Sequence, residues 1–187
     1  MRIISGKLKG RKLIQSRDKK TRPLKDLTKE SIFNLIKHSK KFDLELKNSI
    51  VLDIFSGTGS FGIECISRGS KKVYFIENYK NTIQLLKKNI EKMNVKSNCN
   101  IFTENFFEIS FYKFNKEKFN IIFIDPPYKE QYINKILDQI YDEKLLLKNG
   151  IVIIHRHIKS DDLITKKFSI LETRKYGVSK IIFLKLS

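Results

Sequence analysis

The fold of this chain is decided by the stretch Val51-Leu52-Asp53-Ile54-Phe55-Ser56-Gly57-Thr58-Gly59-Ser60-Phe61-Gly62. Its first half is apolar and predicts a buried strand, and its second half has the glycine spacing G-x-G-x-x-G of a turn that leads into a helix. Glycines in such a turn let a ligand approach the backbone closely. The stretch therefore predicts a strand, a binding loop and a helix within an α/β domain.

From residue 50 onward, apolar runs alternate with helical patterns, which predicts a mostly parallel sheet with helices on both faces. The expected strands are 50–55, 73–76, 98–102, 119–124, 151–154, 169–176 and 179–186, and the expected helices are 59–68, 79–93 and 131–141. Lys148-Asn149-Gly150 is interpreted as a helix end before the fifth strand. Gly177-Val178 joins the last two strands as an antiparallel hairpin, which is the methyltransferase variant of the doubly wound fold.

The composition is that of a soluble globular chain of 187 residues, with 41% hydrophobic and 31% charged residues. No apolar run approaches the roughly 20 residues of a membrane helix, and the basic N-terminus lacks the apolar segment of a secretory signal. Cys65 and Cys99 have no metal-ligand or redox spacing and are interpreted as small buried residues in a reducing compartment. We expect a cytoplasmic protein that is monomeric, with no membrane association and no obligate protein partner.

The formal charge of +18 is unevenly distributed along the chain. Residues 1–25 contain ten Lys or Arg against one acid, Asp18, whereas a general bias toward lysine would spread the charge evenly. We interpret residues 1–47 as a basic extension that faces nucleic acid, built from a hairpin at 2–15 and a helix at 26–38, and residues 48–187 as the main domain. The side chains expected to hold a phosphate backbone are Lys7, Lys9, Arg11 and Arg22.

The glycine loop and two acids predict the kind of cofactor. Glu77, twenty residues after Gly57, is expected at the end of the second strand, where it can accept hydrogen bonds from two ribose hydroxyls. Asp53 lies at the end of the first strand, where a carboxylate repels a pyrophosphate but suits the ammonium and sulfonium groups of S-adenosylmethionine. Phe55, Gly57 and Gly59 complete the predicted cofactor site. A phosphate-binding glycine turn is the alternative.

The second constellation is Ile124-Asp125-Pro126-Pro127-Tyr128. Two prolines cannot continue a central strand, so the strand must stop there, at the carboxyl end where ligands bind in such sheets. An exocyclic amine is a poor nucleophile, and Asp125 and the Pro126 carbonyl can accept its N–H bonds and aim its lone pair at a methyl group. Pro127 fixes the turn, and Tyr128 can stack on the target base. The alternative is a tight turn without chemistry.

Taken together, these motifs resemble the RsmD family of bacterial small-subunit rRNA guanine-N2 methyltransferases over nearly the whole chain. The matching motifs are Met1-Arg2-Ile3-Ile4-Ser5-Gly6, Lys9-Gly10-Arg11-Lys12-Leu13, Thr21-Arg22-Pro23, Glu30-Ser31-Ile32-Phe33-Asn34, the glycine loop, Ser67-Arg68-Gly69, Asp125-Pro126-Pro127-Tyr128 and Tyr176-Gly177. The resemblance implies a Rossmann-like class I fold with seven strands and S-adenosylmethionine as the cofactor. It also implies methylation of one guanine N2 in 16S rRNA, on an assembled or assembling 30S subunit.

Two positions depart from the pattern of the family. After the third strand, where the family usually has an Asp that holds the adenine amino group, this chain has Asn105 followed by Phe106; the Asn carbonyl can still accept that bond. After the fifth strand, where the family commonly has Glu, this chain has His155-Arg156-His157. No third ligand at motif spacing supports a metal site, so we expect a solvated or phosphate-facing histidine pair.

Two other functions fit parts of the sequence. A DNA adenine-N6 or cytosine-N4 methyltransferase fits the Asp125 motif equally well, because that motif is shared by enzymes that methylate amines of DNA, RNA and protein amides. No segment is large enough for a DNA target-recognition domain, however. A non-catalytic RNA-binding assembly factor is the other alternative, and intact Asp125, Glu77 and the loop glycines argue against it.

Overall fold

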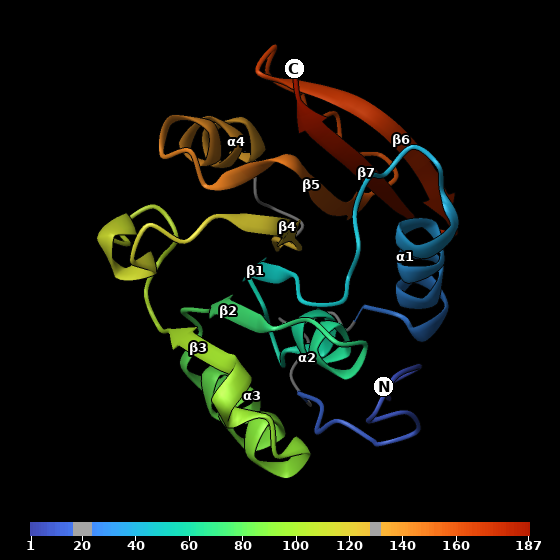
Figure 1. The fold of residues 1–187 in the computed structure, drawn as a ribbon, viewed down its shortest axis with the longest axis vertical. Coiled ribbons are helices and arrows are strands. Elements are labelled where there is room, and N and C mark those ends of the chain that lie inside the picture. Colours follow the sequence, from blue (N-terminus) through green and yellow to red (C-terminus); the bar gives the residue numbers. More distant parts are fainter. Residues whose placement is uncertain (17–23, 128–131) are drawn as a thin grey trace.

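A computed structural model of the chain describes residues 1–16, 24–127 and 132–187. Within these residues, seven strands form one sheet in the order β3-β2-β1-β4-β5-β7-β6 (Figure 1). The strands are β1 Ile50–Ile54, β2 Lys72–Ile76, β3 Cys99–Phe102, β4 Phe119–Ile124, β5 Leu146–His157, β6 Phe168–Tyr176 and β7 Ser179–Leu186. The helices are α1 Asp26–His38, α2 Ser60–Ser67, α3 Lys80–Met93 and α4 Ile133–Asp142, with short 3-10 turns η1 Lys96–Asn98 and η2 Phe111–Phe114. Strands β1 to β5 pair in parallel and β7 pairs antiparallel to both β5 and β6, so the predicted sheet with its closing hairpin is confirmed.

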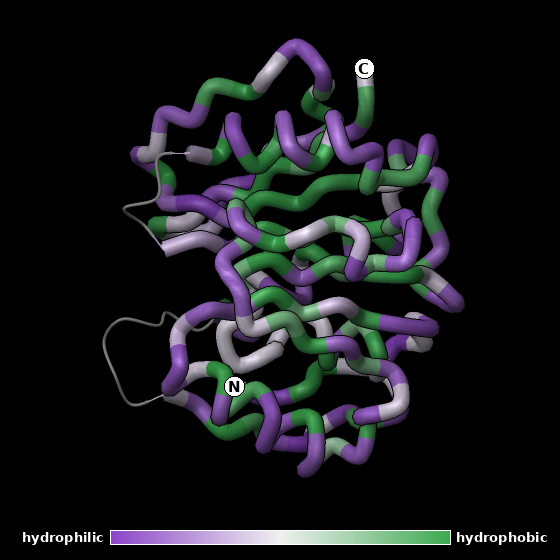
Figure 2. The backbone as a smooth tube through the Cα atoms, turned by 90° about the vertical axis from the view of Figure 1, so that its left-hand side faces the viewer, coloured by the Kyte–Doolittle hydropathy of each residue, from purple (hydrophilic) through white to green (hydrophobic). Residues whose placement is uncertain are grey.

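The two faces of the sheet carry two hydrophobic cores, because successive residues of a strand point to opposite faces. One core joins the odd-numbered residues of the central strands to α1, α2 and α3, and includes Phe61 and Phe123, whose rings stack with centroids 3.9 Å apart. The other core joins the even-numbered residues to α4 and η2. Figure 2 shows hydrophobic stretches of the backbone gathered in the middle of the molecule, and helices lie on both faces of the sheet as predicted.

The start of β5 corrects one prediction. Lys148-Asn149-Gly150 does not end a helix, because α4 ends at Asp142 and β5 has begun by Leu146. The pairing with β4 passes from Phe119↔Leu146 to Ile121↔Ile151, so β5 carries extra residues in an irregular bulge. A side chain at Gly150 would come within 2.9 Å of the Phe119 carbonyl oxygen. Gly150 therefore allows β5 to pack closely against β4. The prediction that Lys148-Asn149-Gly150 ends a helix is wrong, because Asn and Gly are also common in strand bulges.

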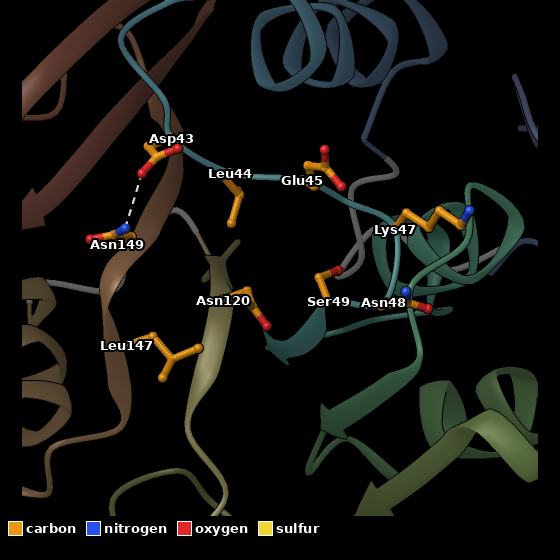
Figure 3. A pocket seen from close by; sticks show the side chains of 9 residues that line it. All are labelled: Asp43, Leu44, Glu45, Lys47, Asn48, Ser49, Asn120, Leu147 and Asn149. Carbon is orange, nitrogen blue, oxygen red and sulfur yellow. Dashed lines mark hydrogen bonds between the residues drawn. The ribbon is translucent and has the colours of Figure 1, made fainter.

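A pocket of about 490 Å³ lies beside this bulge, at the edge of the sheet where β1, β4 and β5 begin, which we call the amino edge (Figure 3). It is lined by Asp43, Leu44, Glu45, Lys47, Asn48, Ser49, Asn120, Leu147 and Asn149. Its polar groups bond to the protein itself: Asn149 donates to Asp43 at 3.0 Å, and Asn120 accepts from the Ile50 N–H at 2.8 Å. Asp43, Asn120 and Asn149 of the lining therefore stabilise the surrounding strands and loops.

The N-terminal segment, residues 1–14, packs into the core formed with α2 and α3. Ile3, Leu8 and Leu13 are buried there, together with Ile32 and Phe33 of α1. The predicted hairpin is reduced to an isolated antiparallel bridge between Arg2 and Lys12. The described parts of residues 1–47 thus share a hydrophobic core with the sheet.

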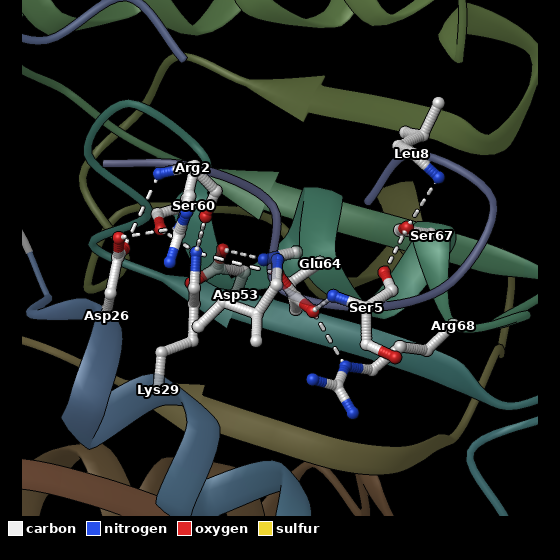
Figure 4. A network of polar contacts seen from close by, with 12 residues as sticks. Arg2, Ser5, Leu8, Asp26, Lys29, Asp53, Ser60, Glu64, Ser67 and Arg68 are labelled. Atoms are coloured by element: carbon white, nitrogen blue, oxygen red, sulfur yellow. Dashed lines mark hydrogen bonds and ion pairs between the residues drawn. The ribbon is translucent and has the colours of Figure 1, made fainter. Parts of the chain in front are cut away.

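Polar contacts fix this segment to α2 (Figure 4). Fully buried Glu64 accepts the backbone N–H groups of Ile4 at 2.8 Å and Ser5 at 3.0 Å. The same carboxylate pairs with Arg68 at 2.7 Å and with buried Lys29 of α1 at 3.5 Å. Burial lowers the pKa of Lys29, and the neighbouring Glu64 opposes that shift. Moving the N-terminal segment away would break its bonds to Glu64, and loss of a buried pair of this kind leaves a buried charge uncompensated. The network therefore holds the segment in one position on α2.

Gly6 lies against the end of α2, where no side chain fits. An added Cβ would lie 1.9 Å from the Ser67 carbonyl oxygen, and the φ of +82° favours glycine in any case. The same carbonyl accepts the Lys7 N–H at 2.8 Å, and the Ser67 hydroxyl accepts the Leu8 N–H at 2.9 Å. The segments around Gly6 and Ser67 therefore form one interlocked contact.

Both cysteines are free thiols, Cys65 buried in α2 and Cys99 half-buried in β3. Across the described ranges, none of the helices combines the length and the apolar character that crossing a membrane would require.

Candidate active site

The sheet register aligns the candidate residues in one row. Ile76, Ile54, Ile124 and Ile154 are neighbours across β2, β1, β4 and β5. The residues that follow them, at what we call the carboxyl edge, are Glu77, Phe55, Asp125 and His155. The first three come directly after their strands, whereas β5 runs to His157 and not to residue 154 as predicted, so His155 lies within it. Asp53 lies two residues before Phe55 in β1. Parallel strands thus gather three predicted acids at the same edge, far in sequence but adjacent in the sheet.

The loop after β1 has an unusual backbone. Phe55, Gly57 and Gly59 adopt φ values of +59°, +57° and +82° within five residues. A side chain at Gly59 would lie 2.5 Å from Leu86 Cδ1, so helix α3 can approach closely. Phe55 is the one non-glycine residue of the three, and such strain persists only where the surroundings impose it. Here Gly57 donates to Glu77 Oε2 at 2.8 Å, and Asn89 of α3 donates to the Thr58 carbonyl at 2.9 Å.

The carboxylates at this edge are buried. Asp53 is 1% exposed and accepts the Gly62 N–H at 3.0 Å. Burial raises the pKa of Asp53 well above its ordinary value, and the nearby charges of Asp125 and Glu77 raise it further. Burial also raises the pKa of Glu77, against the opposing effect of N–H bonds from Tyr79 and Gly57. Three neighbouring acids form a site that repels a pyrophosphate and favours a positively charged ligand.

Asp125 follows β4 directly, and its N–H donates to the Ile54 carbonyl at 3.3 Å. Its side chain is 23% exposed, and its Oδ1 lies 2.9 Å from His155 Nδ1. Pro126 is buried and Pro127 is exposed, while Tyr128 lies outside the described residues. The carboxylate is therefore held by the protein on one side and open on the other.

We expected a solvated or phosphate-facing histidine pair, and solvation is wrong for His155, whose side chain is only 11% exposed. The strand pleat explains this, because His155 points to the same face as Asp125. Two residues later, His157 Nδ1 accepts the Lys159 N–H at 3.1 Å. In the described part of the chain, no cluster of three His, Cys, Asp or Glu side chains could hold a metal ion.

The other predicted residues are more dispersed. Asn105 Oδ1 accepts the Phe107 N–H at 3.1 Å, so its carbonyl already closes a local turn after β3, and Phe106 is buried. Lys7, Lys9 and Arg11 are exposed beside the far ends of α2 and α3, where Arg11 also donates to the Met93 carbonyl at 3.3 Å. Eight-residue α2 is about 12 Å long, which separates these basic side chains from the carboxyl edge. Arg22 lies outside the described residues.

The family described as Conserved hypothetical protein 95 matches residues 1–185 of the chain. The chain belongs to this family. The resemblance to the RsmD family is thereby confirmed: ribosomal RNA small subunit methyltransferase D of Buchnera aphidicola subsp. Acyrthosiphon pisum is 33% identical over 173 residues, which cover 92% of this chain and 86% of that protein.

Solved structures share the fold of this RsmD-family chain. A hypothetical protein of Thermus thermophilus is similar with a TM-score of 0.79 and 20% identity, over 100% of this chain and 99% of that one. An RNA methyltransferase from Salinibacter ruber, solved with S-adenosyl-L-homocysteine, is similar with a TM-score of 0.66 and 14% identity, over 88% of this chain and 94% of that one. The predicted class I methyltransferase fold is confirmed.

Sequence reasoning about this RsmD-family chain missed two features. The contact between His155 and Asp125 depends on the β4–β5 register, which the sequence does not state. Glu64 carries no local signal of its burial, because it lies in an ordinary helical pattern before Ser67, the last residue of α2. Both features appear only when distant segments are brought together.

Proposed function

We propose that this chain transfers the methyl group of S-adenosylmethionine to the exocyclic N2 amine of a guanine in 16S rRNA, on the assembled or assembling small subunit. One observation carries the proposal: Asp125, open on one side, shares the carboxyl edge with the buried acids Asp53 and Glu77 and the strained glycine loop. Membership of the RsmD family supports the rRNA substrate.

The residues of the carboxyl edge fit the proposed cofactor, which supplies an electrophilic methyl group. Glu77 is assigned to the ribose hydroxyls, because each carboxylate oxygen that accepts one N–H bond retains a second lone pair. Asp53 is assigned to the cationic end, since a positive neighbour favours its ionised form. Phe55, Gly57 and Gly59 are assigned to the loop that approaches the ligand. Asn105 and Phe106 are assigned to the adenine.

Asp125 and the Pro126 carbonyl are assigned to the target amine. Accepting its N–H bonds localises the nitrogen lone pair and aims it at the methyl group, for which positioning and electrostatics suffice. Pro127 fixes the carbonyl of Pro126 by restricting the preceding residue. Tyr128, outside the described residues, is proposed to stack on the guanine.

The RNA backbone is assigned to Lys7, Lys9, Arg11 and Arg22. The first three are exposed on a segment that Glu64 and Ser67 hold rigidly on α2, which supports a fixed docking surface about one short helix away from Asp125. Phosphate contacts of this kind make RNA affinity fall steeply with salt. A ribosomal substrate places the protein in the cytoplasm, and the proposal requires neither a second copy nor another protein partner.

Product analysis tests the proposal. The purified protein is incubated with methyl-labelled S-adenosylmethionine and, in parallel, with small subunits lacking this methylation, their deproteinised rRNA, and DNA. We expect labelled N2-methylguanosine from the subunits. N6-methyladenine or N4-methylcytosine from DNA would instead identify a DNA methyltransferase, and cofactor binding without transfer to any substrate would identify an assembly factor.

A further inference from the structure

A side chain of β5, His155, lies within hydrogen-bonding distance of the proposed catalytic carboxylate, Asp125. Because Ile124 and Ile154 are partners in the β4–β5 register, Asp125 and His155 are neighbours one step later, and His155 Nδ1 lies 2.9 Å from Asp125 Oδ1. We propose that His155 is a positioning residue for methyl transfer, a neutral imidazole that donates its Nδ1–H to Asp125 and fixes the orientation of that carboxylate. This inference rests on the role proposed for Asp125.

The two ring nitrogens of His155 decide its protonation state. An ionised carboxylate only accepts hydrogen bonds, so Nδ1 must carry the shared hydrogen. In the described part of the chain, the Nε2 atom is buried and has no hydrogen-bond partner. A hydrogen on that atom would be a buried donor without an acceptor, which is costlier than an unpaired acceptor. The structure therefore favours the neutral tautomer with hydrogen on Nδ1 alone.

The hydrogen bond from His155 makes the two carboxylate oxygens of Asp125 inequivalent. Oδ1 accepts the imidazole N–H and keeps one lone pair, whereas Oδ2 receives no bond from His155, and we assign Oδ2 to the target amine. Without this bond the terminal torsion of an Asp side chain is broad, so the carboxylate can turn away from the orientation that binds the target amine. Because Nδ1 already carries a hydrogen, His155 cannot accept a proton through this contact. Its contribution is to hold Asp125 in the productive geometry.

Two substitutions separate positioning from packing. His155→Asn keeps an N–H donor close to the place of Nδ1, and His155→Leu removes the donor while keeping an apolar side chain. We expect His155→Asn to retain kcat within several-fold and His155→Leu to lower kcat by roughly 100-fold, the usual cost of a misplaced reacting group. The affinity for S-adenosylmethionine should be unchanged in both. His157→Leu, on the same strand face but with its Nδ1 bonded to Lys159, is the matched control and should retain full kcat.

Equal losses in His155→Asn and His155→Leu, or no loss in His155→Leu, would overturn the proposal. A second measurement does not depend on activity: nitrogen NMR of the wild-type imidazole should report hydrogen on Nδ1 and none on Nε2 at neutral pH. A ring with hydrogen on Nε2, alone or on both nitrogens, would also overturn it, even if His155→Leu failed to fold. Absence of methyl transfer by the wild-type protein would reject the proposed function instead, and the tautomer would still report on the contact.

Discussion

The two edges of the central sheet differ in what their polar groups do. At the amino edge, a pocket of about 490 Å³ is lined partly by side chains that bond to one another or to nearby backbone, as Asn149 does with Asp43 and Asn120 does with the Ile50 N–H. At the carboxyl edge, Asp53 and Glu77 are buried carboxylates with raised pKa values, and Phe55 has a φ of +59°. The carboxyl edge therefore buries carboxylates at a cost in free energy and holds Phe55 in a strained backbone conformation.

This difference shows that a cavity alone is a poor sign of function. Buried like charges and a non-glycine residue at positive φ both cost free energy, and folded proteins keep such features mainly where a ligand or a reaction uses them. At the amino edge the charged lining residues Asp43, Glu45 and Lys47 are exposed, and Asn48 has a φ of +62°, a conformation that asparagine tolerates better than phenylalanine. We therefore expect substitutions at the two edges to separate activity from stability.

The largest effect on activity is expected from Asp125→Asn. The amide keeps the size of the side chain but loses the charged acceptor, so methyl transfer should fall by about 10²–10⁴-fold, with the affinity for S-adenosylmethionine unchanged. Single-turnover transfer of labelled methyl groups measures the first, and calorimetry measures the second. Asp43→Asn at the amino edge is the matched control. Equal losses in both variants would break the contrast between the edges.

The next largest effect concerns the support of the strained loop. Helix α2, which begins directly after Gly59, is fixed by Glu64 through Lys29, Arg68 and the N-terminal segment. Glu64→Gln should lower the free energy of unfolding by about 3–5 kcal/mol, because it leaves Lys29 buried without its charge partner. Urea denaturation measures this. Asp26→Asn, which removes an exposed pair with Arg2, should cost less than about 1 kcal/mol.

The cost of burying Asp53 predicts a dependence of stability on pH. The pKa of Asp53 in the folded protein lies above its ordinary value of 3.8. In the window between pH 3.8 and the raised pKa, the native state therefore binds more protons than the unfolded state. The free energy of unfolding of the wild type should therefore fall as the pH rises from 3.8 through the raised pKa. Asp53→Asn should lack this fall and exceed the wild type by roughly 1–3 kcal/mol above the window, a usual size for one substitution. Urea midpoints against pH for both proteins test this, and parallel curves would contradict it.

The smallest effect is expected from Glu77→Gln. The neutral amide can still bond to ribose hydroxyls, but more weakly than a carboxylate, so the Kd for S-adenosylmethionine should rise roughly tenfold. Glu45→Gln, an exposed acid of the amino-edge pocket, should leave that Kd unchanged. If only the second substitution weakened binding, the cofactor would belong to the amino edge.

Much of the carboxyl edge could be predicted because its signals are local. The glycine loop, the acid after the second strand and the prolines after Asp125 all lie within a few residues of a strand end, and the parallel topology brings strand ends together. The bulge at Gly150 could not be predicted, because Asn and Gly suit a bulge in a strand as well as a helix end.

Contacts between segments far apart in the chain could not be predicted from the sequence either. Glu64 is buried because a segment about 60 residues earlier in the chain folds over it, as its bonds to Ile4 and Ser5 show. His155 meets Asp125 because the β4–β5 register advances irregularly at the bulge before Ile151. A register shifted by one residue would point these side chains to opposite faces.

A crystal structure of the protein soaked with S-adenosylhomocysteine tests the central claim most directly. We predict density at the carboxyl edge, with the ribose hydroxyls within hydrogen-bonding distance of Glu77 and the sulfur on the side of Asp125. Density in the amino-edge pocket between Asp43 and Asn149, with an unoccupied carboxyl edge, would contradict the account.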